Sequence, residues 1–245
     1  MTIYTIGAVF GAAIFFISTL ILIPVVYLIR RRSPKIADRI AYPLVMWGFR
    51  MILFGSGVKV TVLGRENIPK DRAVLFASNH RSFFDIIICA TLLPRPFMII
   101  AKKELGKIPL LHFWMVQINC FFLDREDMKS GLEMVNQSTE SLRSGRSVFI
   151  FPEGTRSKTE GQFGEFKGGS FKSAIRAGAP IIPVTCIRTG DVLEDHWFKV
   201  KNRKVVIVFG EAIDTAAIPI KERRFLPEKV LSIIQETYRK YDPGE

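Results

Sequence analysis

A histidine and an aspartate stand five positions apart in the segment 79–85, which reads Asn-His-Arg-Ser-Phe-Phe-Asp. In a regular helix these side chains would point about 140° apart, so His80 and Asp85 can meet only where a helix begins between them. If Ser82 caps that helix, Asp85 lies in its first turn and can accept a hydrogen bond from one imidazole nitrogen. The other nitrogen is then free to take a proton from a hydroxyl group. The alternative is a capping or core histidine followed by an acid that the helix dipole stabilises.

A second polar segment, 151–157, reads Phe-Pro-Glu-Gly-Thr-Arg-Ser. Gly154 permits an unusual backbone conformation and the close approach of a ligand. Arg156 offers a planar fork that suits phosphate oxygens, and Thr155 adds a hydroxyl donor. Glu153 can orient either Arg156 or the turn itself. The alternative is an ordinary Pro-Glu-Gly turn whose polar side chains are solvated.

Each polar segment follows an apolar run that predicts a buried strand, and similar runs recur along the chain with helical patterns between several of them. The predicted strands are 58–63, 73–77, 97–101, 120–123, 147–151, 181–187 and 205–209. The predicted helices are 83–93, 108–118, 128–144, 169–177 and 227–241. This order predicts an α/β domain with a mixed, largely parallel sheet of about seven strands flanked by helices.

Ligands of such sheets gather at the carboxyl ends of the strands, where both polar segments would lie. His80 would then stand beside a cationic, phosphate-sized pocket at Arg156, which predicts chemistry on a hydroxyl of a phosphorylated substrate. Lys102 and Arg125 follow two further predicted strands and would add positive charge at the same edge, although a cation there is usually only solvated. No Gly-x-Ser-x-Gly motif and no cysteine in an electropositive setting is present. His80 would therefore act on the substrate's own hydroxyl, without a covalent enzyme intermediate.

The first 29 residues carry no charged side chain. The segment 3–29 is long enough to cross a hydrocarbon core of about 30 Å as a helix. Three arginines follow it where a signal peptide would have small residues for cleavage, so it is not typical of a signal peptide. These arginines would keep the following domain on the cytoplasmic face of the cell membrane.

Apolar residues recur at helical spacing through 34–57, which predicts a second helix in the headgroup region, with Trp47 and Tyr42 suited to an interface. Alternatively this is a core helix of the domain. Two membrane arrangements stay open: a span followed by an in-plane helix, or a helical pair in one leaflet. The predicted division is 1–57 for the membrane-anchoring helices and 58–245 for the catalytic domain.

The chain is basic, with a formal net charge of +12 over 245 residues and a mean hydropathy of +0.21. A basic protein favours anionic partners such as nucleic acid, anionic lipid or phosphorylated metabolites. The apolar leader favours lipid, and no nucleic-acid motif is present, so nucleic acid is not expected as a partner. Three cysteines without paired spacing predict reduced core residues, and we expect no metal and no cofactor.

Four blocks, taken in order, resemble the bacterial PlsC-type 1-acylglycerol-3-phosphate acyltransferases, also called lysophosphatidic acid acyltransferases, of the glycerophospholipid acyltransferase family. They are 79–85, 121–125, 151–157 and 179–184, and the resemblance spans roughly 58–190. One departure is visible at 166–171, which reads Phe-Lys-Gly-Gly-Ser-Phe where family members often have Phe-Lys-Lys-Gly-Ala-Phe. A basic side chain is lost there.

The resemblance implies acyl-CoA or acyl-carrier protein as the donor, lysophosphatidic acid as the acceptor and phosphatidic acid as the product. It implies that His80 is the general base for the glycerol 2-hydroxyl and Asp85 its partner. The residues implied to bind substrate are Glu153, Gly154, Thr155, Arg156, Lys102 and Arg125. The alternatives are acylation of glycerol 3-phosphate or of another lysophospholipid, and a membrane phospholipid-binding protein with an inactive site.

Overall fold

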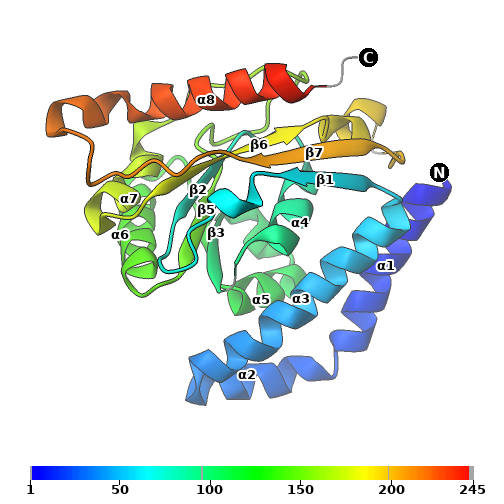
Figure 1. Ribbon diagram of the computed structural model, residues 1–245. Coiled ribbons are helices and arrows are strands. Elements are labelled where there is room, and N and C mark those ends of the chain that lie inside the picture. Colours follow the sequence, from blue (N-terminus) through cyan, green and yellow to red (C-terminus); the bar gives the residue numbers. More distant parts are fainter. Residues whose placement is uncertain (1, 95, 198, 243–245) are drawn as a thin grey trace.

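A single sheet organises the computed structural model, which describes residues 2–94, 96–197 and 199–242. Its strands are β1 (Lys59–Leu63), β2 (Leu75–Ser78), β3 (Phe97–Lys102), β4 (Cys120–Leu123), β5 (Ser147–Ile150), β6 (Ile181–Ile187) and β7 (Lys204–Phe209). They lie in the order β1-β7-β6-β2-β5-β3-β4, and every neighbouring pair is parallel except β6 and β7 (Figure 1). The predicted mixed, largely parallel sheet flanked by helices is confirmed.

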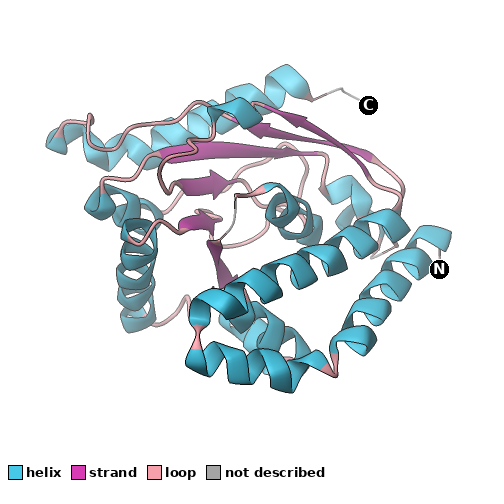
Figure 2. Cartoon of the chain, turned by 60° about the horizontal axis from the view of Figure 1, so that its bottom comes forward, coloured by secondary structure: helices cyan, strands magenta, loops and turns pink. Residues whose placement is uncertain are grey.

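Helices cover both faces of this sheet, which explains why its strands read as continuous apolar runs (Figure 2). On one face lie α3 (Pro34–Ser56), α4 (Phe83–Leu92) and α5 (Pro109–Gln117), and on the other α6 (Met128–Arg143), α7 (Lys172–Ala177) and α8 (Leu226–Tyr241). Side chains alternate between the faces: Phe76 and Phe149 pack towards α3 and α4, and Leu75 and Val148 towards α6 and α8. Burial of each such side chain stabilises the fold by about 1.5–3 kcal/mol.

The apolar leader forms two helices instead of one. They are α1 (Ile3–Thr19) and α2 (Leu22–Arg32), bent by 64° at a short break, so residues 1–57 contain three helices where two were predicted. Pro24 lies in the first turn of α2, where its missing N–H needs no partner. No single helix in the described part of the chain has the length and apolar composition to cross a bilayer, whereas the bent pair meets both criteria together.

Helix α3 has two different faces. Tyr42 and Val45 are buried, and the Tyr42 hydroxyl lies 3.1 Å from the carbonyl oxygen of Ile118 near the sheet. On the opposite side, Trp47 and Phe54 are exposed to solvent. The alternative of a core helix is therefore right for one face of α3, and the expectation that Tyr42 lies at an interface is wrong, because its ring is buried beside the sheet. Trp47, the other residue expected at an interface, is exposed.

Candidate active site

The loop after β2 leads directly into the first turn of α4. Ser82 caps the helix: its Oγ accepts from the Phe84 N–H at 3.0 Å, while its own N–H donates to Asp85 Oδ2 at 2.8 Å. This exchange is a capping box, and it places His80 in the loop and Asp85 in the first turn of the helix. His80 Nδ1 then lies 2.9 Å from Asp85 Oδ2. The predicted helix start and the predicted pairing of the two side chains are both present.

Asp85 is fully buried and organises the backbone as well as the imidazole. Besides His80 and Ser82, the Arg81 N–H donates to the same oxygen at 2.7 Å. A carboxylate held by three donors cannot rotate freely. The alternative role of Asp85, an acid in the first turn that the helix dipole stabilises, is therefore compatible with its pairing to the imidazole.

The His80 ring is fixed in its plane as well as at Nδ1. It stacks on Phe151, with ring centroids 3.8 Å apart and an angle of 13° between the planes. Because Nδ1 faces a carboxylate, this nitrogen carries the proton in the neutral ring, and Nε2 presents its lone pair. Nε2 makes no hydrogen bond to any residue that the structure describes.

The two polar segments are bonded to each other through the backbone of His80. Its N–H donates to Glu153 Oε1 at 2.8 Å, and its carbonyl oxygen accepts from the Ser157 N–H at 2.8 Å. The second oxygen of Glu153 accepts from the Gly164 N–H at 2.7 Å. Burial raises the pKa of Glu153, because an ionised carboxyl is costly away from water, and these two N–H donors oppose that rise. Of the two roles considered for Glu153, the contacts match orientation of the turn.

Arg156 is paired with a residue that the sequence did not indicate. Its Nη1 donates to Glu194 Oε1 at 2.8 Å, and its guanidinium lies 4.1 Å from the centre of the Phe83 ring. Glu194 belongs to an irregular polar segment of short 3₁₀ turns between β6 and β7, where no motif marks it. Thr155 beside Arg156 is exposed, and Gly154 has a φ of +73°, the left-handed region that favours glycine.

Lys102 and Arg125 lie at the same sheet edge but apart from this cluster. In the sheet order, β5 separates β2 from β3, and β4 lies beyond β3. Lys102 pairs with Glu104 at 3.1 Å, and Arg125 is exposed after β4. Within the described ranges, no hydrogen bond or ion pair joins either cation to His80 or Arg156.

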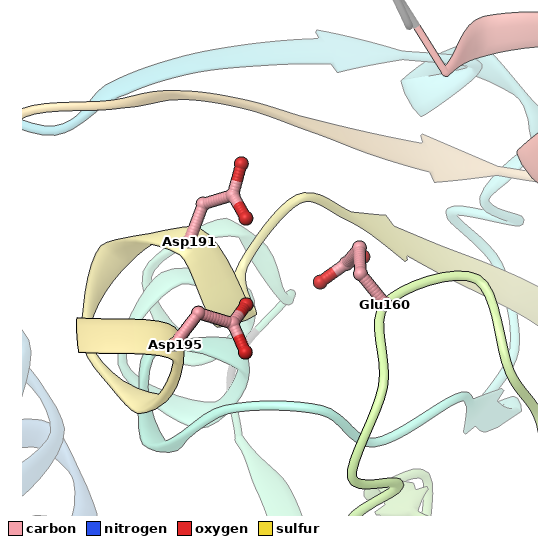
Figure 3. A group of neighbouring side chains, drawn as sticks. All are labelled: Glu160, Asp191 and Asp195. Atoms are coloured by element: carbon pink, nitrogen blue, oxygen red, sulfur yellow. The ribbon is translucent and has the colours of Figure 1, made fainter. Parts of the chain in front are cut away.

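Three carboxylates gather next to the site, with oxygens within 4.8 Å of one another (Figure 3). Asp191 and Asp195 lie on the turns after β6, and Glu160 lies on the facing loop. Arg81 pairs with Asp195 and lies 3.7 Å from Glu160, while Arg188 lies 3.5 Å from Asp191. The guanidinium groups compensate the negative charge of the three carboxylates. The cluster is therefore an ion-pair network that connects the turns after β6 and the loop of Glu160 to Arg81, just before α4.

Comparison with known proteins relates the chain to acyltransferases. The family model described as Acyltransferase matches residues 59–187. The 1-acyl-sn-glycerol-3-phosphate acyltransferase of Borreliella burgdorferi is 30% identical over 198 residues, which cover 81% of this chain and 77% of that protein. A chloroplastic enzyme with the same activity name from Arabidopsis thaliana is 37% identical over 136 residues, 55% of this chain and 38% of that protein.

A solved structure is similar along the whole chain. The crystal structure of the 1-acyl-sn-glycerophosphate acyltransferase PlsC from Thermotoga maritima matches with a TM-score of 0.78 and 26% identity, covering 99% of this chain and 96% of that one. The family model alone covers more than half of the chain. The protein therefore belongs to the acyltransferase family and is an enzyme of the PlsC type, as its four sequence blocks predicted.

Proposed function

We propose that the enzyme transfers an acyl chain from acyl-CoA or acyl-carrier protein to the 2-hydroxyl of 1-acylglycerol 3-phosphate, giving phosphatidic acid. One observation carries this proposal: the imidazole of His80, paired with Asp85, belongs to a loop that is hydrogen-bonded to the turn presenting Arg156. His80, a base for an alcohol, and Arg156, a cation for a phosphate, thus lie on two segments that are hydrogen-bonded to each other. The activity names of the relatives from Borreliella burgdorferi and Thermotoga maritima support the same substrate class.

In the proposed reaction, Nε2 of His80 accepts the proton of the 2-hydroxyl as its oxygen attacks the thioester carbonyl carbon. A new C–O bond forms, and the tetrahedral intermediate collapses by breaking the C–S bond. The leaving thiolate takes the proton from Nε2, so the ring returns to its starting state. Asp85 holds Nδ1–H throughout and stabilises the imidazolium that forms between the two transfers. No side chain becomes acylated.

Arg156 is proposed to bind the phosphate of the acceptor, with help from Thr155 and from the backbone at Gly154. A guanidinium presents several N–H donors in a fixed plane, which suits a tetrahedral anion. Glu153 contributes indirectly, by holding the turn. Lys102 and Arg125 would attract anionic substrates along the sheet edge and not touch the reacting atoms.

The N-terminal helices are proposed to bring this site to the lipid. Residues 1–57 act as the anchoring segment and 58–245 as the catalytic domain on the cytoplasmic face, with Arg31 and Arg32 near the headgroups. The 64° bend between α1 and α2 favours insertion into one leaflet. An acceptor with one acyl chain then stays in the bilayer during the reaction, which avoids about 0.8 kcal/mol per methylene exposed to water.

The test is an acyl-transfer assay with purified protein in mixed micelles. Two donors are tested separately: acyl-CoA and acyl-carrier protein, each carrying a radiolabelled acyl group. Each is offered with 1-acylglycerol 3-phosphate, glycerol 3-phosphate or a lysophospholipid lacking a free phosphate. We expect labelled phosphatidic acid with at least one donor, and little transfer to the third acceptor. Transfer to glycerol 3-phosphate alone would favour the alternative acceptor, and no transfer to either phosphorylated glycerol would contradict the proposal.

Replacing Gly154 by alanine tests whether the turn must keep its shape. An added Cβ would lie 3.2 Å from Lys167 Nζ, and the left-handed φ costs a non-glycine residue about 1–2 kcal/mol. We expect a loss of stability of that size in urea unfolding, and acyl transfer reduced about tenfold or more because the turn shifts. Gly145→Ala is the matched control: Gly145 also has a positive φ, of +84°, but an added Cβ would contact nothing. That variant should lose similar stability and keep its activity; equal activity in both variants would argue against a strict requirement for this turn.

A further inference from the structure

Glu194 forms a further link between the two polar segments of the site, 79–85 and 151–157. Its side chain is 11% exposed, and its carboxylate receives three donors. Oε1 accepts from Arg156 Nη1 at 2.8 Å and from the Phe83 N–H at 2.9 Å, and Oε2 accepts from the Ser82 hydroxyl at 2.6 Å. Glu194 lies outside the residues 59–187 matched by the family model, and none of the four sequence blocks contains it.

The same helix turn also holds the imidazole. Asp85 accepts the Ser82 N–H and faces His80, while Glu194 accepts the Ser82 hydroxyl and faces Arg156. Through Asp85 and Glu194, the imidazole of His80 and the guanidinium of Arg156 are thus both held by contacts to the start of α4. Without Glu194, the turn at 151–157 would place the backbone of Arg156 but not the end of its long side chain.

Glu194 leaves Arg156 able to bind an anion. The guanidinium is held at Nη1 and by the Phe83 ring, whereas Nε and Nη2 make no hydrogen bond to the described residues. A side chain already fixed in one rotamer loses less conformational freedom when it binds a ligand. If the carboxylate instead swung away to make room for a phosphate, the Phe83 N–H and the Ser82 hydroxyl would lose their acceptor. The carboxylate is therefore built to stay in place.

We propose that Glu194 is a positioning residue. It sets the guanidinium of Arg156 at a fixed distance from the imidazole of His80, so that phosphate and hydroxyl of one acceptor molecule reach both. This inference rests on the proposed function. The opposite role, a carboxylate that competes with the phosphate for Arg156, predicts the opposite sign, since its removal would tighten acceptor binding.

The experiment measures kcat and the KM values for acceptor and donor in Glu194→Ala and Glu194→Gln. We expect the alanine variant to raise the acceptor KM about tenfold, because a misplaced Arg156 would lose one charge-assisted hydrogen bond to the phosphate. The donor KM should not change. In the glutamine variant the amide oxygen still accepts from Arg156 and Phe83, so the rise should be about threefold, as a neutral acceptor is roughly half as strong. Glu140→Gln, an exposed acid on α6, is the control and should match the wild type.

A double-variant cycle separates positioning from general damage to the fold. If Glu194 acts through Arg156, then Glu194→Ala should change the acceptor KM less than about twofold in an Arg156→Ala background. The proposal would be overturned if the effects of the two substitutions on the acceptor KM multiplied in the double variant. It would also be overturned if Glu194→Ala or Glu194→Gln lowered the acceptor KM. An inactive wild type would instead refute the proposed function, so the two failures are distinguishable.

Discussion

His80→Ala lowers the rate of acyl transfer by about a thousandfold, within the range that a positioned general base contributes, and leaves the fold intact. We expect the fold to survive because few of the hydrogen bonds around His80 involve its imidazole. The contacts of His80 with Glu153 and Ser157 use its backbone, and alanine keeps them. Only the stacking on Phe151 and the bond to Asp85 are lost.

The comparison requires activity, folding and membrane attachment to be measured on the same preparation. Labelled product formation gives the rate, thermal unfolding gives the stability, and flotation with vesicles gives the attachment. His112→Ala is the matched control, because His112 is an exposed histidine on α5 whose ring contacts Phe122. It should keep full activity. An unchanged rate in His80→Ala would remove the imidazole from the mechanism.

Asp85→Asn should reduce kcat about a hundredfold or more while preserving most of the stability. The amide oxygen can still accept from the N–H groups of Arg81 and Ser82, so the start of α4 survives. The negative charge that holds the Nδ1–H tautomer and stabilises the imidazolium is gone, and burial makes that loss large because water cannot replace it.

Asp85→Ala provides the contrast, since it also leaves two buried N–H groups without an acceptor, at about 1–3 kcal/mol each. We expect this variant to unfold at a clearly lower temperature than Asp85→Asn. Asp127→Asn is the control, because Asp127 is an exposed aspartate that caps α6 and accepts from the Lys129 N–H at 2.9 Å. Equal kcat in Asp85→Asn and Asp127→Asn would show that the charge of Asp85 is dispensable.

The regular elements of the domain could be predicted from the sequence because each carries a strong local signal. Strands covered on both faces appear as apolar runs, and the cap at Ser82 marks the start of α4 with a serine followed three positions later by an acid. The leader gives a weaker signal: its composition is uniform through the break near residues 20–21, so nothing except Pro24 indicates that α1 ends before Arg30.

The site was only partly predictable because its geometry depends on long-range order. Strand order cannot be read from apolar runs, and the insertion of β5 between β2 and β3 is what separates Lys102 from His80. Glu194 gave no signal because it approaches α4 from an irregular turn more than a hundred residues later in the chain. The hydrogen bond from the His80 backbone N–H to the Glu153 carboxylate could not be predicted either, although both residues belong to recognised motifs.

The most direct test of the account is the protection of His80 from carbethoxylation by diethyl pyrocarbonate, followed by peptide mass spectrometry. The chain has three histidines, so His112 and His196 serve as internal references. We predict that 1-acylglycerol 3-phosphate protects His80 alone, and that in Arg156→Ala protection requires about tenfold more acceptor, as expected when a charge-assisted contact is lost. Modification of His80 at the same rate with and without saturating acceptor would contradict the claim that the imidazole and the guanidinium bind one acceptor molecule.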